Sequence, residues 1–182
     1  MEKFSDREII ELILNKQTVN HGFRILVKAY EVKIYWHIRR MVYSHDDAND
    51  IAQNTFVKVW QYLPSFRLDS KLFTWVYRIA TNETLDFLKK KKRYVFAIKG
   101  DYRDELSSIL EDDNIFDGSA IEKKLQKTLL KLPHKQRIVF NMKYFDDLKY
   151  EEMSEILNTS VGALKASYHH AVKKIERNLE FD

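Results

Sequence analysis

The spacing of hydrophobic residues predicts helices along almost the whole chain. After the capping-box sequence SDRE (residues 5–8), the apolar residues Ile9, Leu12 and Ile13 recur at the intervals of one helix face. A second helical pattern covers residues 23–43. A third covers DDANDIAQNTFVKVWQYL (residues 46–63), which opens with acids that suit a helix N-terminus and stops before Pro64. The one Asp-Gly pair, a hairpin-turn signal, lies in a polar stretch at 117–118. We therefore expect an all-α protein.

The stretch TWVYRIATNETLDFLKKKKR (residues 74–93) predicts a further helix with two distinct faces, capped by Asp69 or Ser70. The main apolar face holds Phe73, Val76, Tyr77, Ala80, Phe87 and Leu88. The opposite face holds Trp75, Arg78, Asn82, Asp86 and Lys89. Two interpretations of Trp75 stay open: a second layer of the same domain buries it, or it stacks on unpaired bases of single-stranded DNA. The lysine run is either solvated or in contact with phosphates.

The composition changes after Arg93. Residues 100–122 carry eight acidic residues against one arginine and few periodic apolar residues. They predict a linker, because helical spacing returns from Lys123 onward. We therefore expect two small helical domains, at residues 1–95 and 123–182, joined loosely by an acidic linker over residues 96–122.

The stretch YEEMSEILNTSVGALKASYHHAVKKIERNL (residues 150–179) predicts a helix-turn-helix unit, with Ser160 able to cap its second helix. The apolar face of that helix holds Val161, Leu164, Tyr168, Val172, Ile175 and Leu179. The other face begins with small residues, which permit close approach to base edges, and ends with basic residues, which suit phosphates. The alternative is an ordinary helical hairpin with a solvated polar face.

The composition excludes several kinds of site. The chain has 182 residues, a net charge of +4 and no cysteine, which excludes a thiolate zinc site and a disulfide framework. No segment has the apolar length of a membrane span, and no secretory segment is apparent, so we expect a cytoplasmic protein. The adjacent His169 and His170 share a helix face poorly and lack a third ligand, so we expect no metal or other cofactor. No constellation of carboxylates and histidines predicts an enzyme.

Two segments of the sequence resemble one known family. Residues 47–93, DANDIAQNTF through KKKKR, resemble conserved region 2 of bacterial RNA polymerase sigma factors of the extracytoplasmic-function (ECF) type. Residues 125–175, LQKTLLKLPHKQRIVF through HHAVKKI, resemble their region 4. The resemblance covers nearly the whole chain, with both regions in the family's order. It implies a specificity subunit, without a catalytic site of its own, that binds core RNA polymerase and directs it to promoters through their −10 and −35 elements.

The resemblance also implies roles for region 2 residues. In this family the helix over residues 47–63 meets the β′ clamp helices of the polymerase, through positions matching Asp50, Gln53 and Asn54. Asn54 stands where the family usually has glutamate, which removes one charge from that contact. The loop FRLDS and Asn82 match the pocket that captures a flipped base of the −10 element. The −10 candidates are Phe66, Arg67, Ser70, Trp75, Arg78, Asn82 and Lys89.

For region 4 the resemblance implies that the last helix reads the duplex −35 element. Family members commonly place arginine and serine where KAS (residues 165–167) stands, so a bidentate arginine contact to guanine is missing and a different −35 sequence is expected. The −35 candidates are Lys165, Ser167, His169, His170 and Lys173. The implied partners are the polymerase β′ clamp helices and β flap, promoter DNA, and an anti-sigma factor that is often membrane-anchored. The protein itself is expected to be monomeric when free and not inserted in a membrane.

A free-standing helix-turn-helix regulator is the alternative function. It accounts for the C-terminal unit but leaves the region 2-like half unexplained. Binding to core RNA polymerase separates the two hypotheses.

Overall fold

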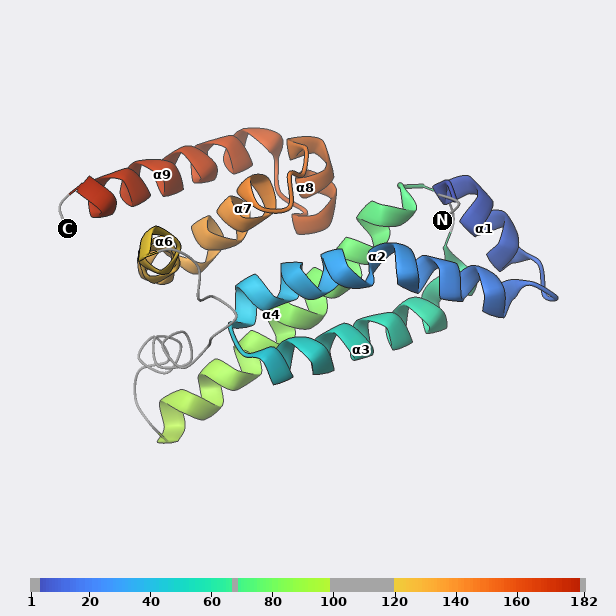
Figure 1. Ribbon diagram of the computed structural model, residues 1–182. Coiled ribbons are helices and arrows are strands. Elements are labelled where there is room, and N and C mark those ends of the chain that lie inside the picture. The colour runs from blue at the N-terminus through green and yellow to red at the C-terminus, as the bar shows by residue number, and fades with distance from the viewer. Residues whose placement is uncertain (1–3, 67–68, 99–119, 181–182) are drawn as a thin grey trace.

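The computed structural model describes residues 4–66, 69–98 and 120–180, and every regular element in these ranges is helical (Figure 1). The expected all-α fold is therefore confirmed. The first half holds α1 (Asp6–Leu14), α2 (Val19–Val42), α3 (His45–Tyr62), a short 3-10 turn (Leu63–Ser65) and α4 (Leu72–Ile98). The second half holds α6 (Ala120–Lys131), α7 (His134–Tyr144), α8 (Tyr150–Leu157) and α9 (Val161–Glu180).

Two of the predicted helix caps are formed. The Ser5 hydroxyl accepts from the Glu8 amide at 3.3 Å, and the Glu8 carboxylate accepts from the Ser5 amide at 2.7 Å, which confirms the predicted capping box. Ser160 Oγ likewise accepts from the Ala163 amide at 3.3 Å, as predicted for the start of α9. Helix α4 runs through the lysine run to Ile98, five residues beyond the predicted end, and α6 begins at Ala120 rather than Lys123.

The first half is a bundle in which α2, α3 and α4 lie side by side and α1 covers one end (Figure 1). Gly22 permits the close approach of α1 to α2, because a Cβ there would lie 2.8 Å from Leu12 Cβ and 3.0 Å from the Ile13 backbone nitrogen. The predicted apolar face of α4 turns into this bundle, with Val76, Tyr77 and Ala80 buried. The opposite face of α4 therefore points away from the bundle core.

The second half has its own small apolar core, formed by α6, α7 and α9. Buried residues of this core are Leu129, Leu132, Phe140, Ala171 and Ile175. Helices α8 and α9 form the predicted helix-turn-helix unit, with Asn158 in the left-handed conformation (φ 48°) ending α8. That conformation is one that asparagine tolerates better than most residues, and it sets the tight turn between the two helices.

The two halves are packed together rather than loosely joined, which differs from the expectation. Apolar residues of α7 and α8, including Met142, Met153 and Ile156, belong to the same buried cluster as Ile34 and Ile38 of α2. Helix α8 packs on α4, and α7 packs on α2. The expected acidic linker lies mostly outside the described residues, and the domain boundaries stay predictions.

Candidate polymerase and promoter-DNA interfaces

The predicted polymerase-binding residues lie together on the solvent face of α3. Asp50, Gln53 and Asn54 are all exposed, and their spacing of three and four residues places them on one side of the helix. The other side of α3 holds Ile51, Thr55 and Val59, which are buried in the bundle. The buried side holds α3 in the bundle, and the exposed side is accessible to a partner.

Next to these residues lies an apolar groove between α2 and α3, with a volume of about 820 Å³. We define the groove by its lining residues, which are Phe23, Val27, Glu31, Val32, Tyr35, Trp36, Asn49, Ala52, Gln53, Phe56, Val57 and Trp60. Val32, Val57 and Trp60 expose 63%, 54% and 40% of their surface. The Phe23 and Trp60 rings meet edge to face with centroids 4.9 Å apart.

Sequence reasoning missed this groove, although Gln53, Val57 and Trp60 recur at helical spacing along one side of α3. The other wall belongs to α2, and only the packing of the two helices reveals that the apolar residues meet. Neighbouring exposed apolar side chains are a feature of interaction sites, and a groove of this form suits a partner helix.

The aromatic residues before and within α4 form a pair. The Phe66 and Trp75 rings lie 4.8 Å apart, and both side chains are half-buried against the bundle core. Trp75 thus belongs to a second layer of the domain, while part of its indole stays in contact with solvent. Ser70 is half-buried nearby in sequence, and Arg67 lies outside the described residues.

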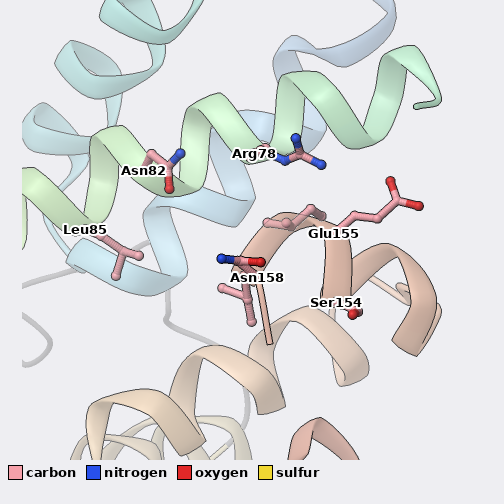
Figure 2. A pocket seen from close by; sticks show the side chains of 8 residues that line it. Arg78, Asn82, Leu85, Ser154, Glu155 and Asn158 are labelled. Carbon is pink, nitrogen blue, oxygen red and sulfur yellow. The ribbon is translucent and has the colours of Figure 1, made fainter. Parts of the chain in front are cut away.

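Arg78 and Asn82 lie one turn apart on α4 and face α8 across a cleft of about 400 Å³ (Figure 2). Leu85 continues the α4 wall, and the opposite wall includes Glu155 and Asn158. Among the described residues, none accepts a hydrogen bond from the buried Arg78 Nε. A cation and an amide on one helix face can bind a phosphate and a base edge, respectively.

The lysine run at the end of α4 is divided between two roles. Lys91 forms an ion pair with Asp47 of α3 at 2.5 Å, which ties the helix to the bundle. Lys89, Lys90 and Lys92 are exposed, and Lys89 lies 3.1 Å from the Asp86 carboxylate. The run is therefore partly structural, with the exposed lysines available to polyanions.

The predicted −35 residues lie along the outer side of α9. Lys165, His169, His170 and Lys173 are exposed, and Ser167 is half-buried. Ser167 lines a third cavity, of about 800 Å³, whose other wall is formed by α4 residues such as Leu88 and Lys92. The Lys165 ammonium lies over the Tyr150 ring at 5.7 Å, a cation–π contact that holds it near the start of the unit.

Within the described ranges, no three His, Asp or Glu side chains come close enough together to hold a metal ion. In the same ranges, no helix combines the length and apolar character that crossing a membrane requires.

A helical bundle with a partly exposed polar and aromatic face, followed by a helix-turn-helix unit, is the arrangement expected of a two-part DNA-binding protein. Comparison with known families identifies the class of protein more specifically. The family described as Sigma-70 region 2 matches residues 26–94, and the family described as Sigma-70, region 4 matches residues 122–175. The first matched range contains α3 and the main part of α4, and the second contains most of α9, so each range includes helices that carry candidate sites.

Relatives that align with most of the chain are also sigma factors. The chain is 35% identical over 166 residues to the ECF RNA polymerase sigma factor SigW of Bacillus subtilis, covering 87% of this chain and 89% of the relative. It is 28% identical to the RNA polymerase sigma-H factor of Pseudomonas aeruginosa, covering 96% of this chain and 94% of the relative. The chain belongs to the ECF family of RNA polymerase sigma factors, the specificity subunits that bind core RNA polymerase and promoter DNA.

Two solved structures share the fold. One is the sigma factor RpoE of Bartonella quintana with the anti-sigma factor NepR (TM-score 0.70, 22% identity, 88% of this chain and 98% of that chain). The other is CnrH with the cytosolic domain of CnrY (TM-score 0.69, 23% identity, 97% of this chain and 98% of that chain).

Proposed function

We propose that this sigma factor docks on core RNA polymerase through α3, reads the −10 element with α4 and the preceding loop, and reads the −35 element with α9. The observation that carries the proposal is the presence of three separate faces on one helical framework. These are the α3 face with its apolar groove, the α4 face with Arg78 and Asn82, and the basic face of α9.

The polymerase contact combines polar and apolar parts. Asp50, Gln53 and Asn54 offer hydrogen-bonding groups at the rim, and Val57 and Trp60 offer an apolar surface beside them. A partner helix laid in the groove would bury the apolar residues while its polar groups meet the rim. The β′ clamp helices are the occupant that we propose.

The −10 contact uses a cation, an amide and an aromatic pair. Asn82 can hydrogen-bond the edge of an extruded base, and Arg78 with Lys89 can hold the backbone. Phe66 and Trp75 supply ring surface beside them, with Arg67 and Ser70 in the connecting loop. Base stacking contributes about 1–3 kcal/mol per base, which offsets much of the cost of unstacking.

The −35 contact uses the first turns of α9 in the major groove. Lys165, Ser167, His169 and His170 lie where base edges are read, and Lys173 lies further along, where phosphates are expected. Since no arginine stands at these base-reading positions, we propose a −35 preference that does not depend on a bidentate guanine contact.

Regulation by an anti-sigma factor forms part of the proposal. One of the two similar structures was solved with the anti-sigma factor NepR and the other with the cytosolic domain of CnrY, and the first of these supports this form of control here. We further propose that the protein is cytoplasmic, is monomeric when free, needs no cofactor and has no catalytic site. The proposed division is region 2 at residues 1–95, the acidic linker at 96–122 and region 4 at 123–182.

Run-off transcription tests the proposal. Core polymerase is supplied with fragmented genomic DNA, with and without this protein. Discrete new start sites with shared upstream elements are expected. Duplex DNA binding without polymerase binding or new transcripts would instead identify a free-standing helix-turn-helix regulator.

A further inference from the structure

We propose that the cavity between α4 and α7 is a binding site for an amphipathic anion, a ligand with an alkyl chain and a carboxylate or phosphate head. We call this space, of about 800 Å³, the α4–α7 cavity. Its volume lies within the range of about 300–1,000 Å³ that is usual for small-molecule sites. The inference goes beyond the proposed function and does not rest on it.

The charged side chains around the α4–α7 cavity are all basic. Lys89 and Lys92 line it from α4, and Lys135 and Arg137 line it from α7, whereas none of the described aspartates and glutamates does. Lys89 already has a carboxylate beside it, that of Asp86 at 3.1 Å. The other three cations form no ion pair with a carboxylate of the described residues. An anion would therefore be attracted without displacing an existing partner.

Arg137 is the least exposed of these four cations. It is 6% exposed, although it lines the cavity. Its guanidinium lies over the Tyr43 ring, 5.6 Å from the centroid, and a ring is a weaker partner for a guanidinium than a carboxylate is. Removing a cation from water without a counter-charge is unfavourable. An anionic head in the cavity would supply that counter-charge.

The first turn of α7 adds to the attraction for an anion. No side chain caps this turn and it holds no acidic residue, while His134 and Lys135 at its start both line the cavity. The free amides and the dipole at a helix N-terminus favour negative charge. Desolvation, followed by the charges of Arg137 and Lys92, lowers the pKa of the His134 imidazole to about 4. Cations from both α4 and α7 thus act at one place on the cavity wall.

Most of the remaining wall is aliphatic. Six of the aliphatic residues that line it are at most 5% exposed, namely Leu88, Leu130, Leu132, Ile138, Val139 and Leu164. An alkyl chain would bury its surface against these side chains. Among the described residues, no aromatic side chain lines the cavity, so a nucleobase would find no ring to stack on.

The two kinds of wall together specify the ligand. A cluster of cations selects an anionic head, and an aliphatic wall beside it selects an alkyl chain rather than a planar base. A free fatty acid and a monoalkyl or monoacyl phosphate share this chemistry. They differ in the head group, which the experiment varies.

Isothermal titration calorimetry on the full chain tests the proposal. The probes are decanoate and decyl phosphate, each below the concentration at which it forms micelles. Decyltrimethylammonium carries the same chain on a cationic head, and acetate carries the carboxylate without the chain.

We expect saturable binding of at least one of the two decyl anions, with decyltrimethylammonium and acetate weaker by about tenfold or more. The anion that binds more tightly identifies the head, and either result supports the site. If neither decyl anion binds, or if decyltrimethylammonium binds equally well, the proposal is overturned.

Paired charge variants locate the binding. The test variant combines Lys92→Gln with Lys135→Gln, and the control combines Lys90→Gln with Lys131→Gln, which are also exposed but do not line the cavity. The test variant should bind the decyl anion about tenfold more weakly, because two charge-assisted contacts are lost. The control should bind like the parent.

A second pair of variants tests the space itself. Ala163→Leu places a larger side chain at the α9 wall of the cavity, whereas Ala166→Leu makes the same change on α9 outside it. Only Ala163→Leu should weaken binding of the decyl anion. All six substituted positions are exposed, and thermal unfolding without ligand checks that each variant is folded. Equal affinities within both pairs overturn the proposal, and failure of the proposed function leaves these results unchanged, since neither polymerase nor DNA enters the titration.

Discussion

The proposed polymerase contact at the apolar groove between α2 and α3 can be tested quantitatively. Val57 lines the groove and exposes 54% of its surface, so the free protein gains little from its side chain. Val57→Ala removes two carbons that a docked helix would bury. At about 0.8 kcal/mol per buried CH₂ group, and with 54% of the side chain left for docking to bury, the loss is about 0.9 kcal/mol, or about 4-fold in the dissociation constant for core polymerase.

The fold should tolerate this change. Alanine has a higher helix propensity than valine, so α3 is not weakened at an exposed position. Leu14→Ala is the control: Leu14 exposes 66% of its surface on α1, outside the groove, and the change removes more apolar surface than Val57→Ala does. It should leave polymerase binding unchanged.

Fluorescence anisotropy of the labelled sigma factor, titrated with core polymerase, measures both constants. Thermal unfolding confirms that the variants remain folded. If Val57→Ala binds within twofold of the parent, or if Leu14→Ala weakens binding equally, the groove is not the docking surface.

Three further predictions concern DNA recognition and folding. Asn82→Ala should reduce binding to a −10 bubble at least tenfold with little change in polymerase affinity, and an equal loss of both would remove Asn82 from the −10 site. Lys173→Ala should weaken duplex binding across sequences and lower the salt slope by about 1, whereas His170→Ala should alter base preference; identical binding profiles for the two variants would contradict a base-reading face. Gly22→Ala should destabilise the fold by about 1–3 kcal/mol in urea unfolding, since its Cβ would lie 2.8 Å from Leu12 Cβ, and an unchanged midpoint would show that α1 shifts freely.

The sequence was sufficient to predict the helices and the helix-turn-helix unit, because these depend on local periodicity and on capping residues within a few positions. The Ser5–Glu8 capping box and the Ser160 cap are formed as predicted. The exposed positions of Asp50, Gln53 and Asn54 also follow from their place on the polar side of one helix. Their roles as site residues stay predictions.

Which faces meet is a tertiary property. Periodicity marks a residue as apolar or polar on its own helix, but it does not name the partner. The packing of Trp75 against Phe66, 4.8 Å away, became visible only in the folded chain, and stacking of Trp75 on bases stays a prediction. Lys91, one of five adjacent basic residues, differs from its neighbours because Asp47 of α3 lies beside it.

The docking of the two halves shows most clearly that sequence periodicity does not name the partner of a residue. Asp146 and Asp147 are adjacent, identical in chemistry and part of one turn, yet one is buried against His37 and Arg40 and the other is almost fully exposed. Local sequence determined the helices on either side of that turn. The burial of Asp146 depends on contacts more than 100 residues away in the chain, and only the packed structure brings those partners together.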